Sequence, residues 1–185
     1  MRQQTGPNLS IPEKTSIELI KIILLVITLS AAYGILHDQI TARVCKEYFT
    51  VDHPDLGWPA IFHNTHPTIL AFAWGIVATV PLATVLAIVL ALAAQAGTWP
   101  RISARMLFFP LLAIFFCMGL LAFGAGFTSY HAALMQHQQS GYVIPAEQAD
   151  FAAHLMSYCA GTLGAVLLTL GVLLIRFLRR RKSIK

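Results

Sequence analysis

Charged side chains are scarce in this sequence of 185 residues: 13 Lys or Arg and 8 Asp or Glu make up 11% of the chain. A soluble domain carries roughly 25% charged residues, whereas 57% of this chain is hydrophobic. The chain therefore lacks the charge that would cover a hydrated surface. It also lacks stretches of about ten residues in which polar and apolar side chains alternate, which excludes a transmembrane β-barrel.

Several motifs that would identify an enzyme are also absent. The sequence has no Gly-rich phosphate loop, no His-Glu-x-x-His pair and no nucleophile motif. Its cysteines, Cys45, Cys117 and Cys159, form no paired motif, so no disulfide can be assigned. Apart from cysteine, no ionisable residue lies at the centre of an apolar run, which argues against a transporter. Enzymatic activity of another kind stays open.

What the sequence does contain is four long apolar runs, at residues 17–36, 68–94, 107–130 and 151–175. A helix needs roughly 20 apolar residues to cross a bilayer core. The first run exceeds the roughly 7–15 apolar residues of a signal peptide, so we predict that it is a true span. The predicted fold is an all-α membrane protein: a four-helix up-down-up-down transmembrane bundle over residues 17–175, with tails at 1–16 and 176–185.

The basic residues predict the orientation of this bundle. Both termini and the short loop near residue 100 fall on one side, and the other two loops fall on the opposite side. The second side carries only Arg43 and Lys46, and every other Lys and Arg belongs to the first. Because positively charged loops stay inside, we expect both termini in the cytoplasm. The basic C-terminal tail fits anionic lipid better than nucleic acid, since no aromatic residues interleave with it.

Two of the predicted spans have distinctive features. The first is expected to continue beyond the bilayer as an amphipathic helix over residues 37–49, until Asp52-His53-Pro54 ends it. In the second span Pro81 predicts a kink, because proline cannot donate to the carbonyl oxygen four residues earlier. Glycines in the third and fourth spans predict close helix–helix contacts.

All seven histidines fall on the predicted outer side of the membrane. They are His37, His53, His63, His66, His131, His137 and His154. His37 ends the first span, His66 precedes the second, His131 ends the third and His154 lies in the first turns of the fourth. Each span therefore offers one imidazole near the same membrane boundary.

Helical geometry, at about 100° per residue, predicts which side chains share a face. On the first helix one stripe contains His37, Thr41, Cys45 and Tyr48, with Asp38 at its margin. On the third, one face contains Cys117, Gly124, His131 and Met135; on the fourth, one contains Glu147, Asp150, His154, Tyr158, Gly161 and Ala165. We expect these faces to point inward, because they also carry the small residues.

Convergence of these faces predicts a metal site at the outer mouth of the bundle. The candidate ligands are His37, His66, His131 and His154, with Asp38, Glu147 and Asp150 as oxygen ligands or as hydrogen-bond partners of the ligands. Imidazole and carboxylate suit copper, zinc or iron, and Cys45 or Met135 would favour copper. Two facing histidines would instead ligate haem. The role would be metal handling or redox chemistry.

Two other interpretations stay open. Histidine is amphipathic and is common at the level of the lipid headgroups. In this interpretation the seven histidines bind neither a metal nor haem. The chain would then be a non-catalytic accessory or structural subunit, whose small-residue faces dock onto a partner membrane protein or a second copy.

The segment from Tyr33 to Thr50, with the pattern YGxxHDQxTARVCxEYFT, resembles a family of small uncharacterised bacterial proteins with four transmembrane helices. The resemblance extends to His154-Leu155-Met156-Ser157-Tyr158 in the fourth span. It implies a bacterial inner-membrane protein and no particular activity.

Overall fold

The computed structural model describes residues 13–54, 56–64 and 66–183. Most of the predicted N-terminal tail, residues 1–12, and the last two residues of the basic tail lie outside the described residues. The helices are α1 (Glu13–Val44), α2 (Lys46–Thr50), α3 (Pro59–Phe62), α4 (Pro67–Val77), α5 (Val80–Gln95), α6 (Ala104–Ser140) and α7 (Pro145–Ser183).

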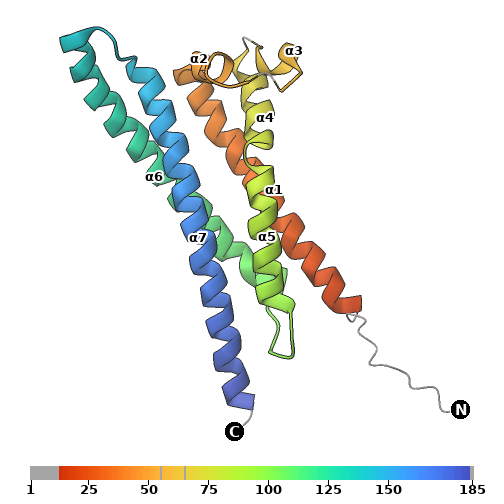
Figure 1. Cartoon of the computed structure of the whole chain (residues 1–185). Coiled ribbons are helices and arrows are strands. Elements are labelled where there is room, and N and C mark those ends of the chain that lie inside the picture. Colours follow the sequence, from red (N-terminus) through yellow and green to blue (C-terminus); the bar gives the residue numbers. More distant parts are fainter. Residues whose placement is uncertain (1–12, 55, 65, 184–185) are drawn as a thin grey trace, which may run out of the picture.

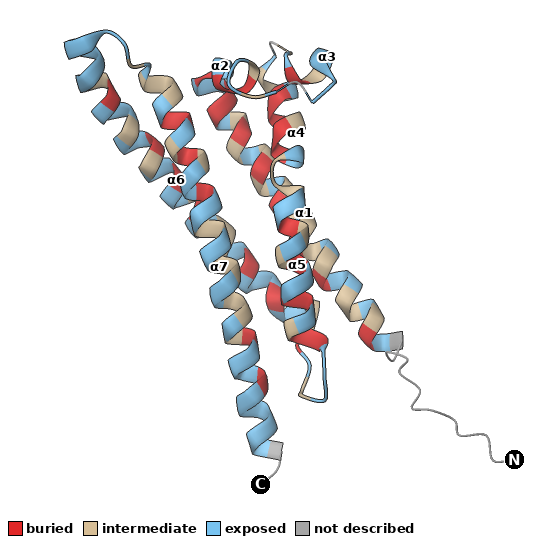
Figure 2. Ribbon diagram, viewed as in Figure 1, coloured by how far each residue is buried: buried red, intermediate tan, exposed pale blue. Residues whose placement is uncertain are grey.

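Four helical segments are long and apolar enough to cross a membrane: Lys14–Val44, Pro67–Gln95, Ala104–Ser140 and Pro145–Lys182. Each contains one of the four predicted spans. Much of the surface of each long helix is exposed (Figure 2). The exposed residues include large apolar ones, such as Phe109 at 76% and Phe116 at 68%. A surface of this kind is stable against lipid tails and unstable in water. The protein is therefore a multi-pass membrane protein, and the predicted all-α fold is confirmed.

The chain runs up, down, up and down, so both ends of the described chain lie at one end of the bundle (Figure 1). The helix α1 lies beside α4 and α5, and α6 forms an antiparallel hairpin with α7 (Figure 1). Gly141 ends α6 in the left-handed conformation, with φ 73°, which glycine adopts without strain. The two halves diverge towards the end that carries α2 and α3, which we call the α2/α3 end (Figure 1).

The helices α1 and α4 touch backbone to backbone at a pair of glycines. A Cβ atom on Gly75 would lie 2.6 Å from the backbone nitrogen of Ile35, and one on Gly34 would overlap the carbonyl oxygen of Gly75. The helix breaks just beyond this contact, at Ala78 and Thr79, as Pro81 predicts. The hydroxyl of Thr79 donates to the Gly75 carbonyl at 2.6 Å.

Gly75→Ala is expected to destabilise the protein, although the same change stabilises most exposed helices by up to about 1 kcal/mol. The added methyl group must push α1 and α4 apart, and overpacking of this kind costs about 1–3 kcal/mol. Thermal unfolding in detergent measures the effect. Gly171→Ala is the matched control, because a Cβ there meets no atom within 4 Å. A Gly75 variant as stable as the control would contradict this account of the helix crossing.

Two apolar clusters hold the bundle together at different heights. The first joins α1, α5, α6 and α7 at the end where α1 begins and α7 ends, and it includes Ile22, Leu90, Leu107 and Val172. The second packs α1, α2, α3 and α4 at the α2/α3 end, around Phe49, Leu70 and Trp74. Between these clusters several polar side chains are buried, among them Ser30, Asp38 and Ser157.

Candidate metal centre

Several of these polar side chains lie on α1, whose predicted stripe is buried. Asp38 is 4% exposed, Thr41 5% and Cys45 6%. The helix breaks at Cys45, earlier than Asp52-His53-Pro54 predicts, and α2 continues the helical course as far as Thr50. After this break Tyr48 and Phe49 pack against His154 of α7, and both are buried.

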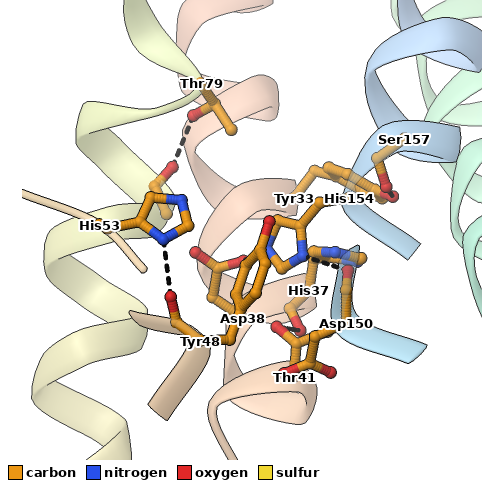
Figure 3. A network of polar contacts seen from close by, with 11 residues as sticks. Tyr33, His37, Asp38, Thr41, Tyr48, His53, Thr79, Asp150, His154 and Ser157 are labelled. Carbon is orange, nitrogen blue, oxygen red and sulfur yellow. Dashed lines mark hydrogen bonds and ion pairs between the residues drawn. The ribbon is translucent and has the colours of Figure 1, made fainter. Parts of the chain in front are cut away.

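His37, Asp38 and His154 come together where α1 faces α7 (Figure 3). One ligand atom from each of the three lies within 4.8 Å of the others, and this is the only such group of three or more among the described residues. Nε2 of His154 is 3.2 Å from Oδ1 of Asp38. The ring centroids of His37 and His154 are 4.7 Å apart, with the rings nearly perpendicular.

A backbone hydrogen bond sets the protonation of His154. Its Nδ1 lies 2.7 Å from the carbonyl oxygen of Asp150, one turn earlier on α7. A carbonyl oxygen can only accept, so Nδ1 must carry a proton and donate it. In the neutral ring the lone pair is then on Nε2, which faces the carboxylate of Asp38. Two acceptors 3.2 Å apart require a proton or a cation between them.

The ring of His37 has one nitrogen without a partner. Its Nε2 is buried, and no hydrogen-bond partner for it exists among the described residues. The ring stacks on Tyr33, with centroids 5.7 Å apart, and the hydroxyl of Tyr33 lies 2.8 Å from that of Ser157 on α7. These contacts hold the imidazole of His37 beside that of His154.

Aromatic side chains from α2 cover the site on the side of the α2/α3 end. The ring centroids of Tyr48 and Phe49 lie 5.0 Å and 5.5 Å from that of His154. Burial raises the pKa of Tyr48 to about 12, so its phenol keeps its proton at neutral pH. Burial also raises the pKa of the Cys45 thiol, which makes this cysteine a poor metal ligand.

His53, which the sequence did not single out as a ligand, flanks the same site. Its Nδ1 lies 2.7 Å from the carbonyl oxygen of Tyr48, so its lone pair is also on Nε2. Its ring packs on Tyr48 and Trp74, at 4.8 Å and 4.9 Å, across the cluster from His37 (Figure 3). His53 lies in the loop after α2, where no helical periodicity could have placed it.

The remaining candidate ligands lie outside this group. His66 is exposed at the start of α4, and Glu147 is half-buried in the first turn of α7. His131 is exposed and packs on Phe127, with ring centroids 4.5 Å apart. Asp150 is 1% exposed; its backbone carbonyl accepts from His154, while its Oδ2 is buried without a partner among the described residues.

The predicted inward face of the third span was wrong. Cys117, Gly124, His131 and Met135 are all exposed, Met135 at 69%. The physical reason is the position of the hairpin contact: α6 packs on α7 through Ala122 and Gly126, and a Cβ on Gly126 would lie 3.2 Å from the Ala149 carbonyl oxygen. This contact leaves the face that bears His131 exposed, with His131 itself at the edge of the hollow between α1 and the hairpin.

Two hollows adjoin the site. A cavity of about 100 Å³ lies beneath it at the centre of the bundle. Its lining is mostly apolar, with a few hydroxyls such as those of Ser30, Thr79 and Ser157 beside the site residues. A larger hollow of about 530 Å³, which we call the lateral crevice, lies between α1 and the α6–α7 hairpin. His37 lines both hollows.

Comparison with known proteins gave no relative: no family model, no curated protein and no solved structure matches the chain.

Proposed function

We propose that this membrane protein binds one transition-metal ion through His37, Asp38 and His154, and that it acts in metal handling or redox chemistry. The observation that carries the proposal is the distance of 3.2 Å between Nε2 of His154 and Oδ1 of Asp38. Nδ1 of the same ring already donates to the backbone carbonyl of Asp150. Two ligands about 2.0–2.1 Å from a tetrahedral zinc ion lie about 3.3–3.4 Å apart, which fits this distance.

A proton between the two groups is the alternative to a metal ion. It would lie on His154, making an ion pair with Asp38, or on Asp38, making a carboxylic acid that donates to His154. In both cases it would leave Nε2 of His37 buried without a partner among the described residues. A buried polar atom without a partner costs about 1–3 kcal/mol. A metal ion bound by the three residues would coordinate His37 as well, with the ligand atoms drawn closer than the 4.8 Å within which they now lie. Metal-binding histidines usually donate their second ring nitrogen to a carbonyl or carboxylate, as His154 does here.

The donor set favours iron(II) or zinc over copper. Two imidazoles and one carboxylate are typical of non-haem iron(II) sites and of several zinc sites. The sulfur ligands that would favour copper do not join the group, since Met135 is exposed and Cys45 holds a buried, protonated thiol. Haem fits less well, because Asp38 stands 3.2 Å from His154 Nε2, where a porphyrin ring would have to lie.

We place the site at the outer face of a bacterial inner membrane. The support is the distribution of charge: eleven of the thirteen basic residues belong to the side of both termini, and Arg43 and Lys46 lie at the α2/α3 end. The metal would then face the periplasm and would be shielded by Tyr48 and Phe49.

His37→Ala and His154→Ala are each expected to lower the metal content of the purified protein from about one equivalent to a small fraction. Loss of a ligand should weaken metal affinity by at least about tenfold to a hundredfold. Loss of a residue that only hydrogen-bonds to a ligand already weakens metal affinity by that factor. The protein is purified in detergent, loaded with iron(II) or zinc, desalted and analysed by elemental mass spectrometry.

His66→Ala and His131→Ala are the matched controls, because both side chains are exposed and lie outside the group. They should retain the metal. The proposal fails if the wild-type protein takes up no stoichiometric metal, or if the four alanine variants lose it equally.

A further inference from the structure

The end of the bundle where α1 begins and α7 ends, which we call the basic end, carries exposed basic side chains. They are Arg101 and Arg105 near the start of α6, and Arg179, Arg180, Arg181 and Lys182 in the last turns of α7. No Asp or Glu occurs at residues 96–103, which connect α5 to α6, or in α7 after Asp150. Glu18 of α1 approaches Ala104, but its carboxylate already accepts from that amide and pairs with Lys21. The basic end therefore has an excess of positive charge.

The buried Arg176 fixes the α5–α6 connection against α7, at the same end of the bundle (Figure 1). Its guanidinium donates to backbone carbonyls of this connection, among them those of Ala96 and Trp99. This attachment brings Arg101 close enough to Arg176 for the two positive charges to repel each other. Because like charges at short range destabilise one another, an anion bound beside Arg101 would relieve the repulsion.

Two aromatic rings support the guanidinium groups at the end of α7. Cζ of Arg180 lies over Trp99, 5.6 Å from the ring centroid, and Cζ of Arg181 lies over Phe177, at 5.0 Å. The two rings contact each other, with centroids 5.9 Å apart. Contact with a ring restricts a long arginine side chain, so less conformational entropy remains to be lost when it binds an anion. Guanidinium groups bind phosphate oxygens through two parallel hydrogen bonds.

An exposed apolar face of α7 leads directly to these charges. Leu170, Leu174, Phe177 and Arg181 follow one another at helical spacing on one face. The three apolar side chains are 56%, 57% and 39% exposed. Trp99 is a residue type that is enriched at the level of the lipid headgroups. One face of the helix thus offers contacts for an acyl chain and, one turn further, positive charge.

We propose that the basic end binds an anionic phospholipid, with its phosphate at Arg180 and Arg181 and an acyl chain along Leu170 and Leu174. This inference concerns the end of the bundle opposite the α2/α3 end and does not depend on the proposed metal. The ligand is an amphiphile, because the charged groups and the exposed apolar face are continuous.

Other ligands fit only part of this surface. Inorganic phosphate or a nucleic acid would neutralise the arginines but would leave Leu170 and Leu174 uncovered. A phosphatidylcholine would cover the apolar face, but its own ammonium group cancels the charge of its phosphate. A net negative headgroup is attracted by each basic residue near the membrane surface.

Native mass spectrometry of the detergent-purified protein tests the proposal. The protein is incubated with equal amounts of dioleoylphosphatidylglycerol and dioleoylphosphatidylcholine, which have identical acyl chains. The phosphatidylglycerol complex should exceed the phosphatidylcholine complex by about tenfold or more, since several basic residues contribute to its binding. Equal amounts of the two complexes would overturn the proposal.

Two double variants separate a defined site from a diffuse attraction by charge. Arg180→Gln with Arg181→Gln removes the guanidinium groups that lie over Trp99 and Phe177. Arg179→Gln with Lys182→Gln is the matched control, because it removes the same charge from the same turns of α7 at exposed positions. The first pair should lower the preference for phosphatidylglycerol about fivefold or more, and the control should change it less than about twofold. Equal losses in the two double variants would overturn the assignment to this site.

Competition identifies the source of the phosphate. Inorganic phosphate and glycerophosphoglycerol, which is the headgroup without its acyl chains, are added in large excess to the phosphatidylglycerol complex. Neither should displace the lipid, because neither contacts the apolar face. Displacement by either would identify a site for a soluble anion, and displacement by a single-stranded DNA oligonucleotide would identify a nucleic-acid site; both results overturn the proposal. The measurements use metal-free protein, so their outcome is independent of the metal centre.

Discussion

Arg176→Leu is expected to lower the melting temperature more than any other single substitution of a basic residue. Arg176 is 2% exposed near the C-terminus of α7. Its guanidinium donates to four backbone carbonyls at the end of α5 and in the following loop: those of Ala93, Ala96, Trp99 and Pro100. The side chain therefore ties α7 to the α5–α6 connection.

The size of the effect follows from these four acceptors. Each hydrogen bond to a charged group contributes about 1.5–3 kcal/mol, and some of the freed carbonyls will reach water at this end of the bundle. A net loss of about 3 kcal/mol corresponds to about 6–12 °C for a chain of this length. The positive charge also stabilises the negative end of the α5 dipole.

Thermal unfolding in detergent, followed by circular dichroism, measures this loss. Arg179→Leu removes the same charge three residues later, at an exposed position, and should change the melting temperature by less than about 2 °C. Arg176→Lys should be intermediate, because an ammonium cannot present the planar fork of five donors. A leucine variant at position 176 as stable as the one at 179 would show that the four contacts contribute nothing.

Composition and hydropathy were sufficient to predict the fold. Four apolar runs, each about long enough to cross a bilayer, leave few alternatives to four spanning helices. Every predicted span lies within one of the four helical segments that are long and apolar enough to cross a membrane. The break before Pro81 was also predictable, because the missing amide proton is a local property of proline. The described helices extend beyond the runs, however, because polar residues such as Arg179 continue a helix outside the apolar layer.

Helix rotation was predictable for α1 and α7 but not for α6. On α1 the polar residues share one stripe, so burial of Asp38 and Thr41 followed from periodicity. On α6 small residues occur all around the helix, and only tertiary contact decides that Gly126, and not Gly124, faces α7. The sequence therefore predicted His37, Asp38 and His154 correctly as neighbours but could not show that His131 is excluded.

The roles of two further residues could not be predicted from the sequence, because contacts with residues distant in the sequence determine them. Arg176 stands close to a run of basic residues that is typical of an exposed tail. Its neighbours in the sequence do not distinguish it from Arg179. His53 follows the break after α2, and its position depends on contact with Trp74, which is distant in the sequence. Sequence periodicity carries no information about either contact.

Asp38→Asn is expected to abolish the stabilisation of the protein by metal without harming the metal-free protein. The lone pair of His154 Nε2 faces Oδ1 of Asp38 at 3.2 Å, so in the metal-free state the two acceptors repel each other unless a proton intervenes. The amide introduced at position 38 can donate to Nε2 and needs no such proton. The melting temperature without metal should therefore stay the same or rise.

In the presence of metal we expect the wild-type protein to have the higher melting temperature of the two. A metal ion at about one hundred times its dissociation constant stabilises the native protein by about 2.7 kcal/mol, or about 5–11 °C for this chain length. An amide is a weaker ligand than a carboxylate, so the metal-dependent increase should nearly vanish in Asp38→Asn and persist in the His131→Ala control. The opposite pattern identifies a structural ion pair: Asp38→Asn would then lower the melting temperature equally with and without metal, because it would leave the buried imidazolium of His154 without its counter-charge. One pair of melting curves thus separates a metal ligand from an ion pair at Asp38.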